Sequence, residues 1–387
     1  MNETYIAAVT IAGMTVGSVG IFVALGAIIL GFIALFGFWF FEVRRPFTLK
    51  RINQNPVLEP KPEHWWESEA VFNPAAVVDQ GRVHVLYRAM GSDGISRIGY
   101  ASSKDGIHFD ERLPYPVFSP TRDFGLPNRN RVYGPLSYSQ TAYASGGGWG
   151  GCEDPRMVTI DNHVHVTFVA FDGWGFVRVA LTSILKKDFL QKQWTWRTPA
   201  LLSPPNEVHK NWVLFPEKIG GRYAILHSIT PKILIDYVDN LEEFDDSNRF
   251  IRGSTRHGGR EGKWDDIVRG AGAPPIKTPH GWLLLYHGMS SKESHIGYKV
   301  GAMLLDLDDP RRVLYRSANP VLVPREWYEH DWKPNVIMAT GAVVMNDDLF
   351  VYYGGGDKRV AVARANLRDF VRQLMHGEHA ELKPVTL

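Results

Sequence analysis

The chain has 387 residues, of which 44% are hydrophobic, and its formal net charge is +2. This composition allows a full hydrophobic core and lacks the excess of positive charge that nucleic-acid-binding domains carry. The single cysteine, Cys152, excludes an internal disulfide framework and a cysteine-rich zinc site. The histidines show no helical His-x-x-x-His spacing, so we predict neither a metal nor another cofactor.

The N-terminal segment is strongly apolar. From Tyr5 to Phe41 it contains no Asp, Glu, Lys or Arg, and about 20 apolar residues suffice to span a bilayer. Aromatic residues close the run, and Arg44 and Arg45 follow it, which is typical of the cytoplasmic interface of a membrane. We therefore expect residues 1–45 to form one transmembrane helix that anchors the protein in a membrane, with residues 46–387 as a cytoplasmic domain.

From Pro46 onward the sequence has the period-two pattern of β-strands. Five hairpins of similar outline begin near Asn73, Asp154, Phe215, Pro274 and Gly341, and each is followed by a second two-strand unit. This repeat predicts an all-β domain, and we expect five four-stranded sheets closed into a five-bladed β-propeller. A two-sheet sandwich is the alternative.

The segment from Gly150 to Arg156 combines chemistry with an unusual backbone. It places the carboxylates of Glu153 and Asp154 and the guanidinium of Arg156 directly after glycines. Glycine allows a ligand to approach the backbone closely, and Pro155 restricts φ. We interpret the segment as a candidate reaction centre at the start of a strand. The alternative is a turn whose carboxylates bind backbone amides and pair with Arg156.

In a propeller the starts of the five first hairpins line the central channel, so we expect their polar side chains to converge. They mix carboxylates, which suit cleavage of a glycosidic bond, with cations, which suit an anion such as phosphate. Aromatic residues such as Tyr298 are candidates to stack on sugar rings. The converging residues are Asn73, Glu153, Asp154, Arg156, Lys210, Asn211, Glu217, Lys218, Lys277 and Asp357.

These residues lie in motifs that resemble glycoside hydrolase family 130, the mannoside phosphorylases and related β-mannosidases. The motifs include Glu153 to Arg156, Lys210 to Lys218, Gly281 to Gly288 and Tyr352 to Asp357. The match runs from about Asn53 to Phe370 and keeps the order of the family. The resemblance implies a five-bladed β-propeller and an enzyme that cleaves β-mannosidic linkages with inversion.

The resemblance also implies roles for single residues. Asp154 is the expected acid, which delivers its proton to the glycosidic oxygen through a sugar hydroxyl. Asn73, Arg88 and Asp357 match positions that hold the mannosyl unit. The full set of expected substrate-binding residues is Asn73, Arg88, Glu153, Arg156, Asn211, His287, Tyr298 and Asp357.

Two positions depart from the phosphorylases, in which arginines hold the attacking phosphate. Lys210 and Ser228 stand there in this chain, and a lysine offers a point charge whereas a serine offers none. The chain also resembles family members that hydrolyse β-1,2-mannosides with a pair of glutamates, for which Glu217 and Glu261 are candidates. We therefore expect water as the acceptor, and thus a β-mannosidase.

Alternatives remain open. Cations such as Lys210 and Lys277 would rebuild a phosphate site, which would make the enzyme a β-mannoside phosphorylase with inorganic phosphate as co-substrate, or a mannosyltransferase in reverse. In another class, the chain would be a membrane-tethered propeller that binds a β-mannoside oligosaccharide without cleaving it. Retention of Asp154 argues against that class, because binding alone does not require an acid.

Overall fold

The computed structural model describes residues 28–33, 48–121, 148, 150–172, 177–245, 249–254, 258–293, 297–376 and 378–379. The chain divides into two compact units, Met1–Phe47 and Thr48–Leu387. In the first unit, residues 28–33 are helical. The strands and the candidate site described below belong to the second unit.

The predicted transmembrane helix is not supported. Spanning a bilayer takes about 20 residues, and of the predicted span the structure describes the helical residues 28–33. Within the part of the chain that the structure describes, no helix is both long enough and apolar enough to cross a membrane. The rest of the predicted span lies outside the described residues. The membrane anchoring and the cytoplasmic location that we inferred from this span therefore have no support.

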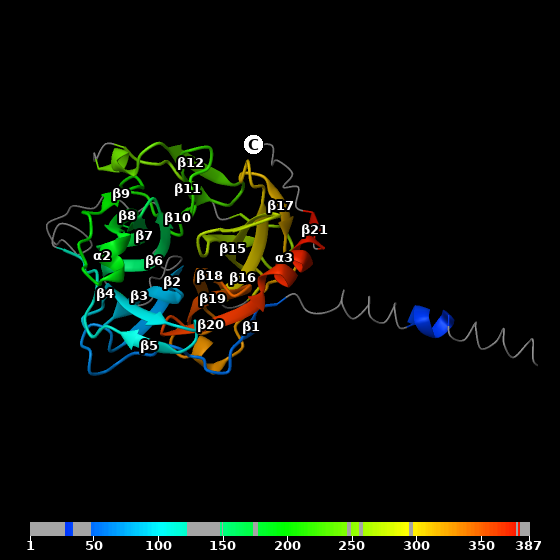
Figure 1. The fold of residues 1–387 in the computed structure, drawn as a ribbon, viewed down its shortest axis with the longest axis horizontal. Helices are drawn as coiled ribbons and strands as arrows, with labels where there is room; N and C mark the ends of the chain where they lie inside the picture. Colours follow the sequence, from blue (N-terminus) through cyan, green and yellow to red (C-terminus); the bar gives the residue numbers. More distant parts are fainter. Residues whose placement is uncertain are drawn as a thin grey trace, which may run out of the picture. The chain divides into compact units, whose positions relative to one another are not determined.

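All five predicted hairpins are present in the second unit, and each continues into a third antiparallel strand (Figure 1). The first hairpin unit consists of β2 (Ala70–Asp79), β3 (Arg82–Met90) and β4 (Ile95–Ser103). The second consists of β6 (Gly150–Ile160), β7 (His163–Phe171) and β8 (Val177–Leu185). The third consists of β10 (Val213–Leu214), β11 (Tyr223–Ser228) and β12 (Leu234–Val238).

In the fourth unit the first strand is split in two, because Pro274 and Pro275 interrupt it. Its strands are β13 (Ile267–Ala271), β14 (Ile276–Thr278), β15 (Gly281–Met289) and β16 (Lys299–Leu305). The fifth unit consists of β18 (Ile337–Met345), β19 (Asp348–Gly355) and β20 (Arg359–Asn366).

Short elements complete the sheets and connections. The outer strands are β1 (Lys50–Arg51), β5 (Phe109–Arg112), β9 (Ala200–Leu201), β17 (Val313–Arg316) and β21 (Glu378–His379). The helices are α2 (Lys186–Leu190) and α3 (Leu367–Met375), with the 3₁₀ turns η2 (Leu241–Phe244) and η3 (Trp327–Glu329).

The strand pairing differs from the predicted five-bladed β-propeller. The described strands form four sheets, of four, three, six and eight strands, instead of five sheets of four. The largest sheet arises because Ile95 and Ser96 of β4 pair in parallel with Gly150 and Gly151 of β6, which joins two hairpin units. Gly151 permits this approach: its φ is +117°, and a Cβ there would lie 2.1 Å from the Ser96 carbonyl oxygen. The glycines thus admit a neighbouring strand, not a ligand as the sequence suggested.

The hydrophobic core lies between consecutive hairpin units. One cluster joins the first unit to the fifth, with Tyr87 and Tyr352 among its members. Further clusters join the first unit to the second, the second to the third and the third to the fourth. The first, second and third units therefore bury both faces of their sheets against neighbouring units, which fixes the strands that carry Asn73 and Asp154.

A buried group of one carboxylate, one tyrosine and one arginine recurs in three units. The tyrosine, on the second strand of the hairpin, donates a hydrogen bond of 2.7–2.8 Å to the carboxylate, and the arginine on the outer strand pairs with the same carboxylate. The residue opposite the tyrosine is small: Gly99, Gly301 or Ala361. The groups are Glu67–Tyr87–Arg112, Asp265–Tyr286–Arg316 and Glu329–Tyr353–Arg51.

The first strands of the hairpins are irregular near one end. Register shifts interrupt β2, β6, β13 and β18, and positive φ angles occur at Asn73 (47°), Asp154 (50°) and, just before β10, Asn211 (63°). β2, β6 and β18 contact one another near the middle of this unit (Figure 1). Bulges redirect side chains, and here they bring polar groups from separate units together.

Candidate active site

Asp154 and Asn73 form the centre of the candidate site. The Nδ2 atom of Asn73 donates a hydrogen bond of 2.8 Å to Oδ1 of Asp154, and the two residues are 2% and 5% exposed, respectively. Gly354 makes room for this contact, because a Cβ at that position would lie 2.1 Å from Oδ1 of Asn73. The bulges on β2 and β6 therefore aim the two side chains at each other across separate hairpins.

Arg88 on β3 forms ion pairs with the carboxylates of both Glu153 and Asp154. Its Nη2 lies 2.9 Å from Oε1 of Glu153, and its Nη1 lies 3.2 Å from Oδ1 of Asp154. Its Nε donates to Oγ of Ser96 at 3.0 Å, and its guanidinium carbon lies 4.6 Å from the centre of the Phe72 ring. The arginine is buried and held from three sides, so it fixes the orientation of the carboxylates.

Arg156 links the second, third and fourth units. It donates to the backbone oxygen of Asp154 (2.7 Å), to Oδ1 of Asn211 (2.6 Å) and to the backbone oxygen of Gly272 (3.2 Å). Asn211 in turn donates to the backbone oxygen of Arg269 at 2.7 Å. Burial lowers the pKa of Arg156 to about 10, against the opposing effect of Asp154, so the guanidinium remains charged at neutral pH.

The charges around Asp154 decide its protonation. Burial by itself raises the pKa of this carboxyl, but the positive charges of Arg88, Arg156 and Lys210 and the hydrogen bond from Asn73 outweigh burial and hold the pKa below its usual range. The Nζ of Lys210 lies 3.5 Å from Oε2 of Glu153. Without a ligand, Asp154 is therefore ionised at neutral pH.

Asp357 behaves in the opposite way. It follows β19 with a φ of +53° and forms an ion pair of 3.3 Å with Lys333. Burial raises its pKa; the negative charge of Asp154 adds to this effect, while Lys333 and Arg88 oppose it. The site thus contains two aspartates whose environments shift their pKa values in opposite directions.

His287 on β15 is fully buried and neutral. Its Nε2 accepts a hydrogen bond of 2.8 Å from the backbone N–H of Ala339, so the ring proton lies on Nδ1. Burial, together with the charge of Arg156, lowers its pKa to about 3, against the effect of Asp154. His287 therefore neighbours the cluster as a neutral ring.

Other predicted site residues lie elsewhere. The carboxylate of Glu217 pairs with Lys277 near the surface, and Lys277 faces Trp282 on β15, five residues from His287. At a rise of about 3.3 Å per residue, this pair is roughly 16 Å along the strand from His287. Glu261 is exposed in the turn before β13. The structure does not bring Glu217, Glu261 or Lys277 to the cluster.

Tyr298 and Lys218 were also predicted to line the site. Tyr298 accepts a hydrogen bond of 3.0 Å from Nε of Arg269, which places it beside the strand that Asn211 contacts. Lys218 pairs with Asp161, at the opposite end of β6 from Asp154.

Sequence reasoning missed several residues of the cluster. Lys333 pairs with Asp357, Ser96 holds Arg88, and Gly354 makes space for Asn73. Gly354 lies within the motif that ends at Asp357, but nothing in the motif indicates its contact with Asn73, and each of the three contacts joins segments that only folding brings together. Cys152 is buried, and burial raises the pKa of its thiol well above the usual range, so it acts as a small packing residue. Among the described residues, no three His, Cys, Asp or Glu side chains are placed to hold a metal ion.

Comparison with known proteins identifies the family. The family model described as beta-1,4-mannooligosaccharide phosphorylase, of glycoside hydrolase family 130, matches residues 48–128 and 141–376. The chain belongs to glycoside hydrolase family 130. Its cluster around Asp154 is therefore the candidate active site of an enzyme that acts on β-mannosides and cleaves them.

Several relatives of the chain are phosphorylases by name. The chain is 36% identical to a 1,2-beta-oligomannan phosphorylase of Thermoanaerobacter sp. (strain X514), over 83% of this chain and 98% of that one. It is 33% identical to a beta-1,2-mannobiose phosphorylase of the same organism, over 82% and 97%. The solved beta-1,2-mannobiose phosphorylase of Listeria innocua superposes with a TM-score of 0.62 at 28% identity, over 84% and 99%. These relatives favour phosphorolysis over the hydrolysis that we expected from Ser228, and phosphate is the co-substrate of the family's phosphorylases.

Proposed function

We propose that this enzyme is an inverting phosphorylase of β-1,2-linked mannosides, which uses inorganic phosphate and releases α-mannose 1-phosphate. We assign the β-1,2 linkage because three relatives, at 36%, 33% and 33% identity, are named for β-1,2-linked mannose. The family model is named for β-1,4-linked substrates, but the relatives at 26% identity, which act on β-1,4-linked or 4-O-linked mannosides, are more distant.

The observation that carries the proposal is an excess of positive charge. Four cationic side chains converge with three carboxylates, and the backbone of Arg269 adjoins the same cluster. A site that binds only neutral sugar and water has no need of this surplus of one positive charge, whereas the surplus attracts a phosphate anion. The cations are Arg88, Arg156, Lys210 and Lys333, and the carboxylates are Glu153, Asp154 and Asp357.

The proposed reaction follows from this arrangement. Asp154 gives its proton to a sugar hydroxyl, and that hydroxyl gives its own proton to the glycosidic oxygen, which leaves with the bonding electrons. A phosphate oxygen attacks the anomeric carbon from the opposite face, so a β-mannoside yields the α-phosphate. Asn73 holds the Asp154 carboxylate at 2.8 Å, and Arg88 holds it at 3.2 Å.

Phosphate has a second effect in this proposal. Arg88, Arg156 and Lys210 keep the pKa of Asp154 low, which makes the aspartate a poor acid. A bound dianion offsets these charges and raises the pKa. The co-substrate therefore prepares the acid that the reaction needs, and water as the acceptor would not.

Product analysis tests the proposal. Purified enzyme is incubated with β-1,2-mannobiose in the presence and absence of phosphate, and a parallel incubation contains β-1,4-mannobiose. We expect α-mannose 1-phosphate and mannose from the β-1,2-linked disaccharide only when phosphate is present. Release of free mannose alone, at a rate that does not depend on phosphate, would contradict the proposal. Faster cleavage of the β-1,4-linked disaccharide would contradict the assigned linkage.

A further inference from the structure

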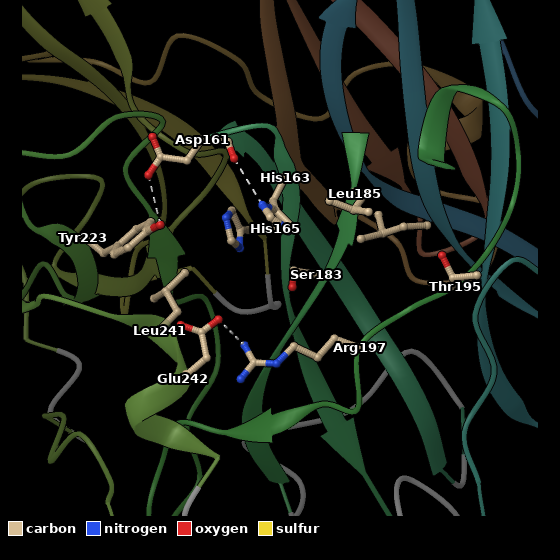
Figure 2. A pocket seen from close by; sticks show the side chains of 11 residues that line it. Asp161, His163, His165, Ser183, Leu185, Thr195, Arg197, Tyr223, Leu241 and Glu242 are labelled. Atoms are coloured by element: carbon tan, nitrogen blue, oxygen red, sulfur yellow. Dashed lines mark hydrogen bonds and ion pairs between the residues drawn. The ribbon is translucent and has the colours of Figure 1, made fainter. Parts of the chain in front are cut away.

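The buried carboxylate of Asp357 pairs with a cation from outside the hairpins. The Nζ atom of Lys333 lies 3.3 Å from Oδ2 of Asp357, and the two side chains are 26% and 10% exposed, respectively. Figure 2 shows a contrasting pair beside a cavity at the turn of the β6–β7 hairpin, where Arg197 pairs with a Glu242 side chain that is 59% exposed. Water screens exposed charges, so Lys333 acts more strongly on Asp357 than Arg197 acts on Glu242.

Asp357 lies at the tip of the β19–β20 hairpin. Gly356 and Asp357 have φ angles of +56° and +53°, and the backbone N–H of Lys358 donates to the backbone oxygen of Gly355 at 3.0 Å. Two central residues with positive φ are typical of a type I′ turn, which joins two antiparallel strands tightly. The turn therefore fixes the backbone that carries the Asp357 carboxylate.

A covering segment, residues 327–336, packs over this turn and carries Lys333. The backbone N–H of Lys333 donates to the backbone oxygen of Gly356, and the N–H of Gly356 donates to the backbone oxygen of Val336, both at 2.9 Å. A Cβ at Gly356 would lie 3.1 Å from the backbone oxygen of Tyr328. Lys333 is thus held beside Asp357 by its own backbone.

Several charges act on Asp357. Burial raises its pKa above the usual range; Lys333 and Arg88 lower that pKa, and Asp154 raises it. Arg88 also pairs with Glu153 and Asp154, so its charge is shared. The other titratable side chains of the covering segment have partners elsewhere: Tyr328 contacts Tyr353, Glu329 pairs with Arg51, His330 accepts a hydrogen bond from the N–H of Asn335, and Asp331 pairs with Lys358 and Arg359.

A carboxylate in this place suits a sugar better than phosphate. An ionised carboxylate repels an anion, but it accepts hydrogen bonds from several hydroxyl groups at once. A protonated carboxyl group uses one oxygen as a donor and loses part of that capacity. The charge state of Asp357 therefore decides how well it can bind a sugar.

We infer that Lys333 is a positioning residue for the sugar side of the site. Its charge keeps Asp357 in the form of a carboxylate, which accepts hydrogen bonds from hydroxyl groups of the mannosyl unit. The choice of a mannosyl ligand rests on the proposed function, whereas the pairing of Lys333 with Asp357 does not. The cations of the site are thereby divided: Lys333 serves the sugar, and Lys210 serves phosphate.

Mannose provides a direct probe, because neither phosphorolysis nor hydrolysis consumes it. Its affinity is measured by NMR titration without phosphate, between about pH 5 and pH 8. We expect Lys333→Met to weaken mannose binding about tenfold or more at the acidic end, because Asp357 loses the cation that stabilises its carboxylate. Lys358→Met is the matched control, since Lys358 follows Asp357 directly but pairs with Asp331 at 3.6 Å, and it should bind mannose as wild type does. Equal affinity of wild type and Lys333→Met at every pH would overturn the inference.

The pH dependence distinguishes lost charge from lost structure. Mannose affinity should fall as the pH falls through the pKa of Asp357, because the carboxylate then takes up a proton. Lys333 lowers this pKa, so the fall should begin at a higher pH in Lys333→Met than in wild type. A loss of affinity that is the same at all pH values would indicate a structural role and would overturn the inference.

Two further variants separate charge from shape. Lys333→Arg keeps the charge and should retain the wild-type affinity within a few-fold at each pH. Lys333→Gln keeps a hydrogen-bond donor without the charge, and it should lose affinity at acidic pH as Lys333→Met does. Circular dichroism checks that each variant is folded. Wild-type affinity of Lys333→Gln across the whole pH range would contradict a role for the charge.

Turnover separates this inference from the proposed function. We expect Lys333→Met to raise the KM for β-1,2-mannobiose about tenfold at acidic pH while changing the KM for phosphate much less; the reverse pattern would assign Lys333 to phosphate and overturn the inference. Release of mannose by wild type without phosphate, together with weaker mannose binding by Lys333→Met, would refute the proposed function alone. Phosphate-dependent formation of mannose 1-phosphate, with an unchanged KM for mannobiose in Lys333→Met, would refute this inference alone.

Discussion

The candidate acid lies among cations that oppose its protonation. Asp154 contacts Arg88 at 3.2 Å and Asn73 at 2.8 Å, and both favour the carboxylate. We expect Asp154→Asn to lower turnover of β-1,2-mannobiose by about a hundred- to ten-thousand-fold, because the proton donor is lost. Steady-state kinetics with the purified variant checks this, with circular dichroism as the folding control. Near-normal turnover would exclude Asp154 as the acid.

The pH profile should depend on phosphate. The acid must be protonated, so activity falls as the pH rises through the pKa of Asp154, which the neighbouring cations lower. Bound phosphate raises that pKa, and we therefore expect the falling limb of the rate profile to move to higher pH as phosphate approaches saturation. Initial rates across pH at low and high phosphate measure the shift. If the falling limb of the rate profile lies at the same pH at low and at high phosphate, bound phosphate does not change the pKa of Asp154.

Lys210 provides a test of the anion site. Its ammonium lies 3.5 Å from Glu153, on the same cluster as Asp154. We expect Lys210→Met to raise the KM for phosphate by about tenfold or more while changing the KM for mannobiose much less, because a charge-assisted contact to phosphate is lost. Lys277→Met, at the surface pair with Glu217, is the matched control and should behave as wild type.

At the scale of single elements, the parallel contact between β4 and β6 depends on Gly151. A Cβ there would lie 2.1 Å from the Ser96 carbonyl oxygen, at a φ of +117°. We expect Gly151→Ala to reduce the free energy of unfolding by about 2 kcal/mol or more, since steric overlap adds to backbone strain. Urea denaturation measures the loss. Gly220→Ala is the control, because Gly220 also has a positive φ but has no atom within 4 Å of the added Cβ; equal losses in both variants would show that steric overlap is unimportant.

The three carboxylate–tyrosine–arginine groups should contribute alike. Each tyrosine hydroxyl satisfies a buried carboxylate that also pairs with an arginine. We expect Tyr87→Phe, Tyr286→Phe and Tyr353→Phe each to cost about 1–3 kcal/mol of unfolding free energy, because a buried acceptor loses its donor. Tyr115→Phe, at a tyrosine that is 47% exposed, is the control. No measurable change in the three variants would show that the repeat does not stabilise the hairpin units.

The elements also show what sequence can and cannot predict. The period-two pattern predicted all five hairpins, because alternation and turn residues are local properties. The fusion of β4 with β6 was missed, because a parallel contact between distant segments leaves no local pattern. For the same reason the contact of Lys333 with Asp357 and that of Gly354 with Asn73 were missed, whereas Asp154 and Arg156 are site predictions that come from a local motif.

Across the whole folded unit, the hairpins supply the scaffold and their irregular first strands supply the site. Hydrophobic clusters between consecutive units fix the strands, and the bulges on β2 and β6 aim Asn73 and Asp154 at each other. Comparison of the five hairpins in the sequence predicted that their polar residues converge, and it placed Glu217 among them. In the structure Glu217 pairs with Lys277, which lies opposite Trp282 on β15, away from the cluster.

The most direct measurement of the central claim is a crystal structure of the enzyme soaked with mannose and phosphate. The account predicts a phosphate within hydrogen-bond distance of Lys210 or Arg156, facing the anomeric carbon of a mannose that contacts Asn73 and Asp357. A mannose bound there with an ordered water in place of the phosphate, or a phosphate bound only outside the cluster around Asp154, would contradict it.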